Sequence, residues 1–263
     1  GNRPMTCLVS SRTVDVGGEP SILNIVQDIT EQRKAEKAIL KLDQAKSAFI
    51  STAAHELRTP LIAIVGYSEL LENSAKMTIS EDQRDSYISI IQSNAEILNR
   101  LVDDLLDVGR IQVGRSLGIT PKESDLARII DNVVGSLKLR CQHHHMIVSH
   151  KNALPESLML DSGRISQVMN NLLNNAIKYS PQGGTIEILT DTGQKEVSIA
   201  IIDRGVGMTP QQVEHMFDRF YRAESVSAET SGLGLGMNIT KQIVADHGGE
   251  IVVSSVDGEG TTV

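Results

Sequence analysis

The stretch FISTAAHELRTPLIAIVGYSELL, residues 49–71, decides the fold of the first half of the chain. Its apolar residues recur at alternating steps of three and four, which is the spacing of a helix packed in a bundle. These residues are Ile50, Ala53, Leu57, Pro60, Ile64, Tyr67 and Leu71. His55 lies off this stripe, about 200° around the helix from Ala53 and from Leu57. We therefore expect its imidazole to face solvent.

Glu56 is next to His55, and Thr59 follows one turn later on the same side. A single histidine on a surface helix is most often a solvated residue without a function. Here the pair Thr59-Pro60 places an imino acid inside the helix, where it removes a backbone hydrogen bond and bends the axis at a cost of about 3 kcal/mol. A bend of that cost beside a histidine and a carboxylate indicates a functional site.

The composition limits the class of protein. The chain has 263 residues, 40% of them hydrophobic, which is enough for two or three globular domains. Its net charge of −8 argues against a nucleic-acid partner, and no apolar run approaches the length of a membrane span. Cys7 and Cys141 lack metal or redox spacing, and no signal peptide opens the chain. We expect a cytoplasmic fragment without membrane contact, whether or not its parent protein is anchored.

The N-terminal half has three predicted parts. Residues 1–30 form strand, turn and strand, too few to bury a core, and are expected to be the tail of a domain whose beginning is missing. Residues 31–48 have the apolar spacing of a coiled-coil linker. Residues 49–116 form two antiparallel helices around a loop at 73–82. Two amphipathic helices bury too little surface alone, so we expect a homodimer that completes a four-helix bundle.

Residues 121–263 alternate helices with β-rich runs, which indicates a second domain of α/β type. We predict helices at 125–139, 162–179 and 236–247, and strands at 146–149, 185–190, 197–202 and 250–255. The fold class is therefore α+β and multidomain. It combines a helical hairpin with an α/β sandwich. Consecutive histidines at 143–145 point to alternate faces of a strand, so we do not expect a metal site there.

A polar face on the 162–179 helix is the first chemical motif of this domain. Asn171, Asn175 and Lys178 share that face at spacings of four and three. Repeated amides lower helix propensity, which makes packing a poor explanation for them. Amide oxygens suit Mg²⁺, which keeps most of its waters and binds substrate phosphates. A solvated polar face is the alternative interpretation.

Two glycine-rich segments complete the candidate site. Asp203-Arg204-Gly205-Val206-Gly207 follows a predicted strand, and its glycines allow the backbone to approach a ligand closely. A carboxylate there can accept a hydrogen bond from an exocyclic amine such as that of adenine. The second segment, residues 232–236 with the sequence GLGLG, feeds a helix N-terminus and is typical of a phosphate site. Between them, residues 208–230, which include Phe220 and Arg222, are long enough to form a lid.

Taken in order, these motifs resemble the H, N, G1, F and G2 boxes of the sensor histidine kinases of two-component systems. The boxes are HELRTP at 55–60, NLLNNAIKY at 171–179, DRGVG at 203–207, FDRF at 217–220 and GLGLG at 232–236. The resemblance covers about residues 31–263, and Asp28-Ile29-Thr30-Glu31 resembles the exit of a PAS sensor domain. The chain departs from the family in ending at Val263, where we expect it to stop short of the last strand of the ATP-binding domain.

The resemblance implies an ATP-dependent and Mg²⁺-dependent kinase that phosphorylates itself and then an aspartate of a response regulator. His55 would be the nucleophile, Glu56 the acceptor of its proton, and Thr59 the residue that orients water for dephosphorylation of the regulator. Asn175 with Asn171 would hold Mg²⁺. The implied ATP-binding residues are Asn171, Asn175, Lys178, Tyr179, Asp203, Gly205, Gly207, Phe220, Arg222, Gly232, Leu233, Gly234, Leu235 and Gly236.

Two other functions are compatible with parts of this pattern. One is an ATP hydrolase of the same nucleotide-binding superfamily, which uses a glutamate four residues before the Mg²⁺ asparagine to activate water. That position is Asn171, an amide that cannot act as a base. The other is a non-catalytic dimerisation and nucleotide-sensing module, which intact boxes do not favour.

Overall fold

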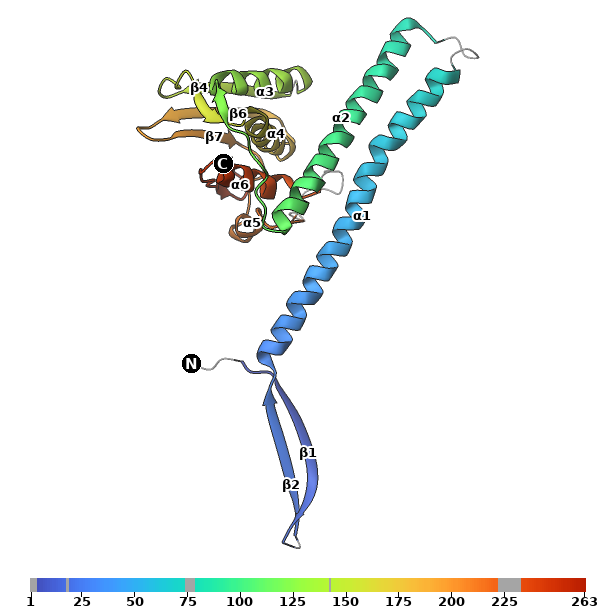
Figure 1. Cartoon of the computed structure of the whole chain (residues 1–263), viewed down its shortest axis with the longest axis vertical. Coiled ribbons are helices and arrows are strands. Elements are labelled where there is room, and N and C mark those ends of the chain that lie inside the picture. Colours follow the sequence, from blue (N-terminus) through green and yellow to red (C-terminus); the bar gives the residue numbers. More distant parts are fainter. Residues whose placement is uncertain (1–3, 18, 74–78, 142, 222–232) are drawn as a thin grey trace. The chain divides into compact units, whose positions relative to one another are not determined.

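A computed structural model describes residues 4–17, 19–73, 79–141, 143–221 and 233–263. The chain divides into two compact units, residues 1–54 and 55–263 (Figure 1). The boundary falls inside the long helix α1, Thr30–Glu72, so this helix contributes to both units. Among the described residues, none of the helices is long and apolar enough to cross a membrane.

The first unit contains a β-hairpin and the start of α1. Strands β1, Cys7–Val16, and β2, Glu19–Asp28, pair antiparallel, which confirms the predicted strand, turn and strand with longer strands than expected. The base of the hairpin is tied to the first turn of α1. The backbone N–H of Thr6 donates to Oγ1 of Thr30 over 2.8 Å, and that of Ile29 donates to the carbonyl of Thr6 over 2.9 Å.

Helix α1 is continuous through the predicted linker and the histidine-bearing stretch. It also passes through Pro60, which is buried, so the proline does not end the helix. The coiled-coil interpretation depends on Ala38, Leu42 and Ala45, whose side chains lie outside the described residues. The helical state of this segment is confirmed.

The second unit begins with a helical hairpin, as predicted. Helix α2, Glu81–Gln112, starts at a capping box in which Ser80 and Gln83 exchange side-chain and backbone hydrogen bonds. The rings of Tyr67 and Tyr87 meet across the hairpin with centroids 5.2 Å apart. Several apolar side chains on the two helices nevertheless stay exposed in the single chain. They are Leu61, Ile62, Val65, Leu70, Ile88, Val102 and Leu106.

The rest of the second unit is built on a five-stranded mixed sheet of order β4-β6-β7-β9-β8. Its strands are β4, His144–His150, β6, Gly184–Thr192, β7, Val197–Asp203, β8, Ser254–Val256, and β9, Gly260–Thr262. The pair β4–β6 is parallel and the other pairs are antiparallel. A separate two-stranded sheet joins β3, Lys122–Ser124, to β5, Leu158–Leu160.

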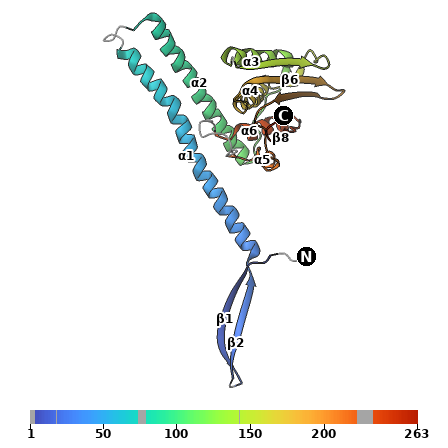
Figure 2. The same ribbon diagram turned by 180° about the vertical axis from the view of Figure 1, so that it is seen from behind.

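Three helices form a layer against this sheet, and α4 lies between the other two (Figures 1 and 2). They are α3, Leu126–Arg140, α4, Ser162–Lys178, and α6, Gly236–Asp246. Strand β6 buries Ile186 and Ile188 while Glu187 between them is exposed, so one face of the sheet is covered. The domain is therefore a two-layer α/β sandwich, and the predicted fold class is confirmed.

The C-terminal part of the sheet differs from the prediction. The strand expected at 250–255 is found only as Ser254–Val256, and Gly260–Thr262, which were not predicted as a strand, form β9 between β7 and β8. Helix α5, Pro210–His215, was also missed. Its capping box, Thr209 with Gln212, and the proline at its first turn are signals that could have located it.

The core of the sandwich is centred on α4, which supports a stability prediction. Leu173 is 0% exposed, whereas Leu139 on α3 is 85% exposed. We expect Leu173→Ala to lower the free energy of unfolding by about 2–5 kcal/mol, because it leaves a cavity in a closely packed core. Urea unfolding measures this loss. Leu139→Ala should change stability by less than about 0.5 kcal/mol, and an equally small effect of Leu173→Ala would contradict the assigned core.

Candidate active site

His55 is exposed on α1, as its position off the apolar stripe predicts. Two residues of that stripe, Ala53 and Pro60, are buried on the other side of the helix. The hydroxyl of Thr59 donates to the backbone carbonyl of His55 over 3.2 Å, which keeps the hydroxyl within one turn of the imidazole. His55 and Thr59 therefore share an accessible surface of the helix.

The polar face of α4 is half-buried and meets α6. Asn171, Asn175 and Lys178 are half-buried, while Asn174, at the edge of this face, is exposed. Nδ2 of Asn171 donates to the carbonyl of Gly236 over 3.3 Å and to Oγ1 of Thr240 over 3.4 Å. Asn171 therefore holds the start of α6 against α4, a contact that the sequence analysis did not anticipate.

The C-terminal end of α4 contacts the segment that follows β7. The backbone N–H of Val206 donates to the carbonyl of Tyr179 over 2.9 Å. A Cβ at Gly205 would collide with that same carbonyl, and a Cβ at Gly207, whose φ is 64°, would collide with the carbonyl of Val256. These two glycines are thus required by close contacts with the protein's own backbone, whereas the sequence analysis related them to a ligand.

Asp203 ends β7 at the edge of this segment and is half-buried. Burial raises the pKa of its carboxyl above the usual value, and hydrogen bonds from the backbone N–H groups of Gly205 and Thr261 partly oppose that increase. One carboxylate oxygen accepts from Gly205 over 2.9 Å. A carboxylate that is kept partly buried at this cost is typical of a functional group.

The glycine-rich segment before α6 combines buried leucines with a helix N-terminus. Leu233 and Leu235 are 7% and 1% exposed, so their side chains anchor the segment in the core. Gly234 has a φ of 68°, which a residue with a Cβ rarely adopts. Leu235 occupies the N-cap position of α6 and makes no side-chain hydrogen bond to the first turn. The first N–H groups of α6 are thus available to an anion.

The segment between the two glycine-rich stretches is described only at its start. Nδ2 of Asn238 on α6 donates to the carbonyl of Phe217 over 3.0 Å, and the ammonium of Lys241 lies 5.0 Å from the ring centroid of Phe217. Phe220 has a φ of 67°, an uncommon value for a residue with a side chain. Arg222 and Gly232, both predicted to bind ATP, lie outside the described residues.

The structure thus brings three of the predicted motifs together around α4. Asn171, the first residue of its polar face, contacts Gly236, and Tyr179 at its C-cap contacts Gly205 and Val206. Lys178 and Tyr179 are adjacent to that second contact, with the ammonium 5.3 Å from the tyrosine ring centroid. His55 lies on a different element, α1. The candidate residues are thus divided between two elements, α1 and α4.

The donor set around α4 suits a hard cation bound mainly through a substrate. Within the described ranges, no group of three histidine, cysteine or acidic side chains is arranged to hold a metal ion. Amide oxygens of Asn175 and Asn171 are the ligands that the polar face offers, and for Asn171 this leaves Oδ1, because Nδ2 contacts α6. Such a sparse set fits Mg²⁺ better than a cation that needs a full protein cage.

Comparisons with known proteins agree with this arrangement. Residues 45–114 match the model of the His Kinase A (phospho-acceptor) domain, and residues 160–263 match that of the histidine kinase-, DNA gyrase B- and HSP90-like ATPase. The first match contains His55, and the second contains α4 and both glycine-rich segments. The chain belongs to the sensor histidine kinases of two-component systems.

A curated relative of the chain is also a sensor histidine kinase. The sensor histidine kinase WalK of Bacillus subtilis (strain 168) is 30% identical over 245 residues, which are 92% of this chain and 38% of WalK. The chain thus spans well under half the length of this relative.

Two solved structures share the fold, full-length ShkA in complex with AMPPNP and the histidine kinase ThkA in complex with the response regulator TrrA. ShkA matches at 23% identity with a TM-score of 0.57, over 84% of this chain and 44% of its own. ThkA matches at 19% identity with a TM-score of 0.51, over 97% and 76%.

The raised pKa of Asp203 gives a prediction on stability and pH. Because the folded protein holds this carboxyl at a raised pKa, its contribution to stability falls as the pH rises through that pKa. We expect Asp203→Asn, which can still accept from Gly205, to maintain or raise the free energy of unfolding at pH 7. The difference in free energy of unfolding between this variant and the native protein should become less favourable to the variant at lower pH.

Urea unfolding at several pH values measures this difference, with Asp131→Asn on the exposed face of α3 as the matched control. A clear loss of stability in Asp203→Asn at pH 7 alone would mean that the folded protein needs the negative charge.

Proposed function

We propose that this chain is the kinase core of a sensor histidine kinase, which transfers the terminal phosphoryl group of ATP to His55 and from there to an aspartate of a response regulator. The single observation that carries the proposal is the convergence of the polar face and both glycine-rich segments on α4, together with an exposed histidine on the helical hairpin. The complex of ShkA with AMPPNP supports ATP as the nucleotide.

Roles for the residues around α4 follow from their chemistry. Asp203 accepts a hydrogen bond from the exocyclic amine of adenine, and Tyr179 packs on the ring. Lys178 neutralises phosphate charge. The uncapped first turn of α6 and the Gly232–Gly236 segment receive the phosphate oxygens. Phe220 and Arg222 belong to the lid that would cover the nucleotide. Leu233 and Leu235 act as anchors of the glycine-rich segment, because their side chains are buried in the core.

Asn175, with Asn171 as a second ligand, would hold Mg²⁺. The bound cation neutralises charge that develops on the phosphates during transfer. The protein's own part is to hold the amide oxygens in place, which for Asn171 is supported by its hydrogen bonds to Gly236 and Thr240. Mutation of Asn175 removes a ligand, whereas mutation of Asn171 also loosens the contact between α4 and α6.

At His55, one imidazole nitrogen attacks the terminal phosphorus of ATP and ADP leaves. Glu56 accepts the proton from the other ring nitrogen, which makes the attacking nitrogen more basic. The exposed position of His55 supports this role, because the same nitrogen must later be reached by the aspartate of a receiver domain. The complex of ThkA with TrrA supports a response regulator as the partner.

A homodimer through the helical hairpin is the proposed assembly. Apolar side chains of α1 and α2 remain exposed in the single chain, among them Leu61, Val65, Val102 and Leu106, and a second hairpin would bury them. Residues 1–30 are proposed to be the C-terminal strands of a PAS sensor domain, since Leu8, Ile22 and Ile25 of the β-hairpin are exposed and could pack on its other strands. The boundaries 31–48, 49–116 and 121–263 remain proposals for the linker, phosphotransfer and catalytic parts.

Incubation with γ-labelled ATP tests the kinase. We expect acid-labile, base-stable label on the protein that disappears in His55→Gln, because the glutamine has no nucleophilic ring nitrogen. His145→Gln, at an exposed histidine of β4, is the matched control and should retain the label. Release of free phosphate without label on the protein would favour the ATP hydrolase. Tight ATP binding with neither product would favour the non-catalytic module.

A phosphatase activity on the regulator is a second proposed function, supported by the position of the Thr59 hydroxyl beside His55. We expect Thr59→Ala to leave the rate of labelling within about twofold and to slow removal of phosphate from the regulator by roughly tenfold or more, the size of a lost contribution to proton transfer or orientation. Thr59→Ser keeps the hydroxyl and should retain the activity. Equal loss of both activities in Thr59→Ala would count against the role.

A further inference from the structure

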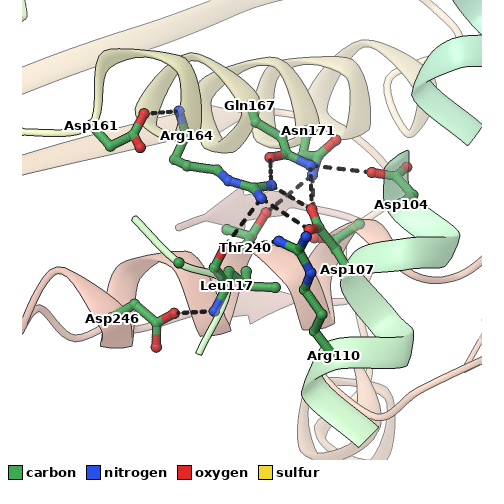
Figure 3. A network of polar contacts seen from close by, with 12 residues as sticks. Asp104, Asp107, Arg110, Leu117, Asp161, Arg164, Gln167, Asn171, Thr240 and Asp246 are labelled. Atoms are coloured by element: carbon green, nitrogen blue, oxygen red, sulfur yellow. Dashed lines mark hydrogen bonds and ion pairs between the residues drawn. The ribbon is translucent and has the colours of Figure 1, made fainter. Parts of the chain in front are cut away.

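The contact between α2 and the catalytic domain contains a buried ion pair that the proposed chemistry does not use. Arg164, in the first turn of α4, donates from both terminal nitrogens to the carboxylate of Asp107 near the end of α2, as Figure 3 shows. The side chain of Asp107 is only 4% exposed. The hydrogen bonds that Arg164 donates to Asp107 raise the pKa of its guanidinium. A paired, two-pronged contact of this kind fixes orientation as well as distance.

Gln167 and Asp104 extend this pair into a cluster, which we name the α2–α4 clamp and define as Asp104, Asp107, Arg164 and Gln167. Oε1 of Gln167 accepts from Arg164 over 2.8 Å, and its Nε2 donates to Asp104 over 3.2 Å. Each member of the clamp thus contacts a residue on the other side of the same interface (Figure 3).

The chain that connects α2 to the catalytic domain is held in the same place. Leu117 is 1% exposed, and its N–H donates to Asp246 at the end of α6 over 2.8 Å. Its carbonyl accepts from both Arg164 and Arg110 over 3.4 Å. This connection is therefore bound to the domain on both sides, so the orientation of the domain on α2 is specified by side chains and not by a loose tether.

Burial raises the pKa of Asp104 to about 6, an effect that the hydrogen bond from Gln167 partly opposes. The nearby charges are Asp107 and Asp103, which raise the pKa further, and Arg100, which lowers it. The contact between α2 and the catalytic domain thus favours the protonated carboxyl of Asp104. This contact weakens as the pH rises through about 6. At neutral pH the clamp contains one strong ion pair and one carboxylate that is buried at a cost, a balance that suits a contact which opens and closes.

The position of the clamp on the hairpin indicates which state it holds. Counted along each helix from the closed end of the hairpin, Asp104 lies roughly 9 Å and Asp107 roughly 14 Å further along than His55, and both are on the other helix. His55 is exposed in this arrangement. A single imidazole must accept a phosphoryl group from the catalytic domain and then admit a receiver domain, so the catalytic domain needs at least two positions. The clamped position is the one that leaves His55 open.

We propose that Arg164 is a positioning residue, which through Asp107 holds the catalytic domain in a withdrawn position on α2, and that this pair must break before phosphoryl transfer to His55. The inference rests on the proposed kinase function. Packed interfaces of this kind switch between discrete arrangements, so loss of the pair should shift the population toward the transfer-competent position.

Autophosphorylation kinetics of the whole chain test the proposal. We expect Arg164→Gln and Asp107→Asn each to raise the maximal rate by about fivefold or more, the usual size of a coupling between two sites. The KM for ATP should stay within about twofold, since neither residue belongs to the nucleotide site. Arg164→Lys retains the charge but not the two-pronged geometry. Its maximal rate should lie between those of the native chain and Arg164→Gln. Arg128→Gln, at an exposed arginine of α3, is the matched control.

A variant of Asp104 should act in the opposite direction. Asp104→Asn still accepts from Gln167 but removes the buried charge, so it should tighten the clamp and lower the rate at pH 8. General destabilisation of the fold cannot produce both an increase at Arg164 and a decrease at Asp104. Unchanged or reduced rates in both Arg164→Gln and Asp107→Asn, with normal thermal unfolding, would overturn the proposal.

Hydrogen exchange separates this inference from the proposed function. The amide of Leu117 is protected by its bond to Asp246 and should exchange faster in Arg164→Gln than in the native chain. If the native protein forms no phosphohistidine, the kinase assignment fails, and faster exchange in the variant would still support the clamp. If the exchange and the rate are both unchanged, the clamp does not hold the domain.

Discussion

The packing of α4 between the sheet, α3 and α6 is the interaction on which the rest of the molecule depends. One face of this helix buries Val168, Met169, Leu172, Leu173 and Ala176 in the core of the sandwich. That packing fixes the rotation of the helix about its axis, and with it the direction of every other side chain on it. The polar face, the contacts to both glycine-rich segments and the clamp to α2 all follow from that one orientation.

The same helix therefore joins the proposed nucleotide site to the proposed clamp. Asn171 near its middle contacts the start of α6, Tyr179 at its end contacts the segment after Asp203, and Arg164 at its beginning contacts α2. One rigid helix, α4, thus connects the proposed nucleotide site to the interface with α2. Rigid elements with two discrete arrangements at their ends are a physical means of coupling two sites. In this chain the coupling would run along α4, between the proposed phosphate site at the start of α6 and Asp107.

Most of the fold could be predicted from local sequence pattern. The helical hairpin follows from three-four apolar spacing, and the helices of the sandwich from the same spacing with clear N-caps at Asp125 and Asp161. Strand β8 was predicted too long and β9 was missed, because each has only three residues, too few for an alternating pattern to be recognised. The exposed position of His55 was predictable because it depends only on helical geometry.

The site could be predicted only in part, because spacing reveals which residues share a face but not what they touch. The sequence grouped Asn171 with a metal but gave no sign that its Nδ2 also binds α6. It related Gly205 and Gly207 to a ligand, whereas carbonyls of Tyr179 and Val256 exclude a side chain there. Arg164 and Asp107 were missed altogether, since they are 57 residues apart and carry no motif of their own.

The central claim is that α4 joins both glycine-rich segments into one nucleotide site. Amide hydrogen exchange with and without AMPPNP and Mg²⁺ tests it most directly, because it reports on each segment separately. Slower exchange is expected at 171–179, 203–207 and 233–240 together, with no change in β1 and β2. Protection that is absent, or confined to one of the three segments, would contradict a shared site.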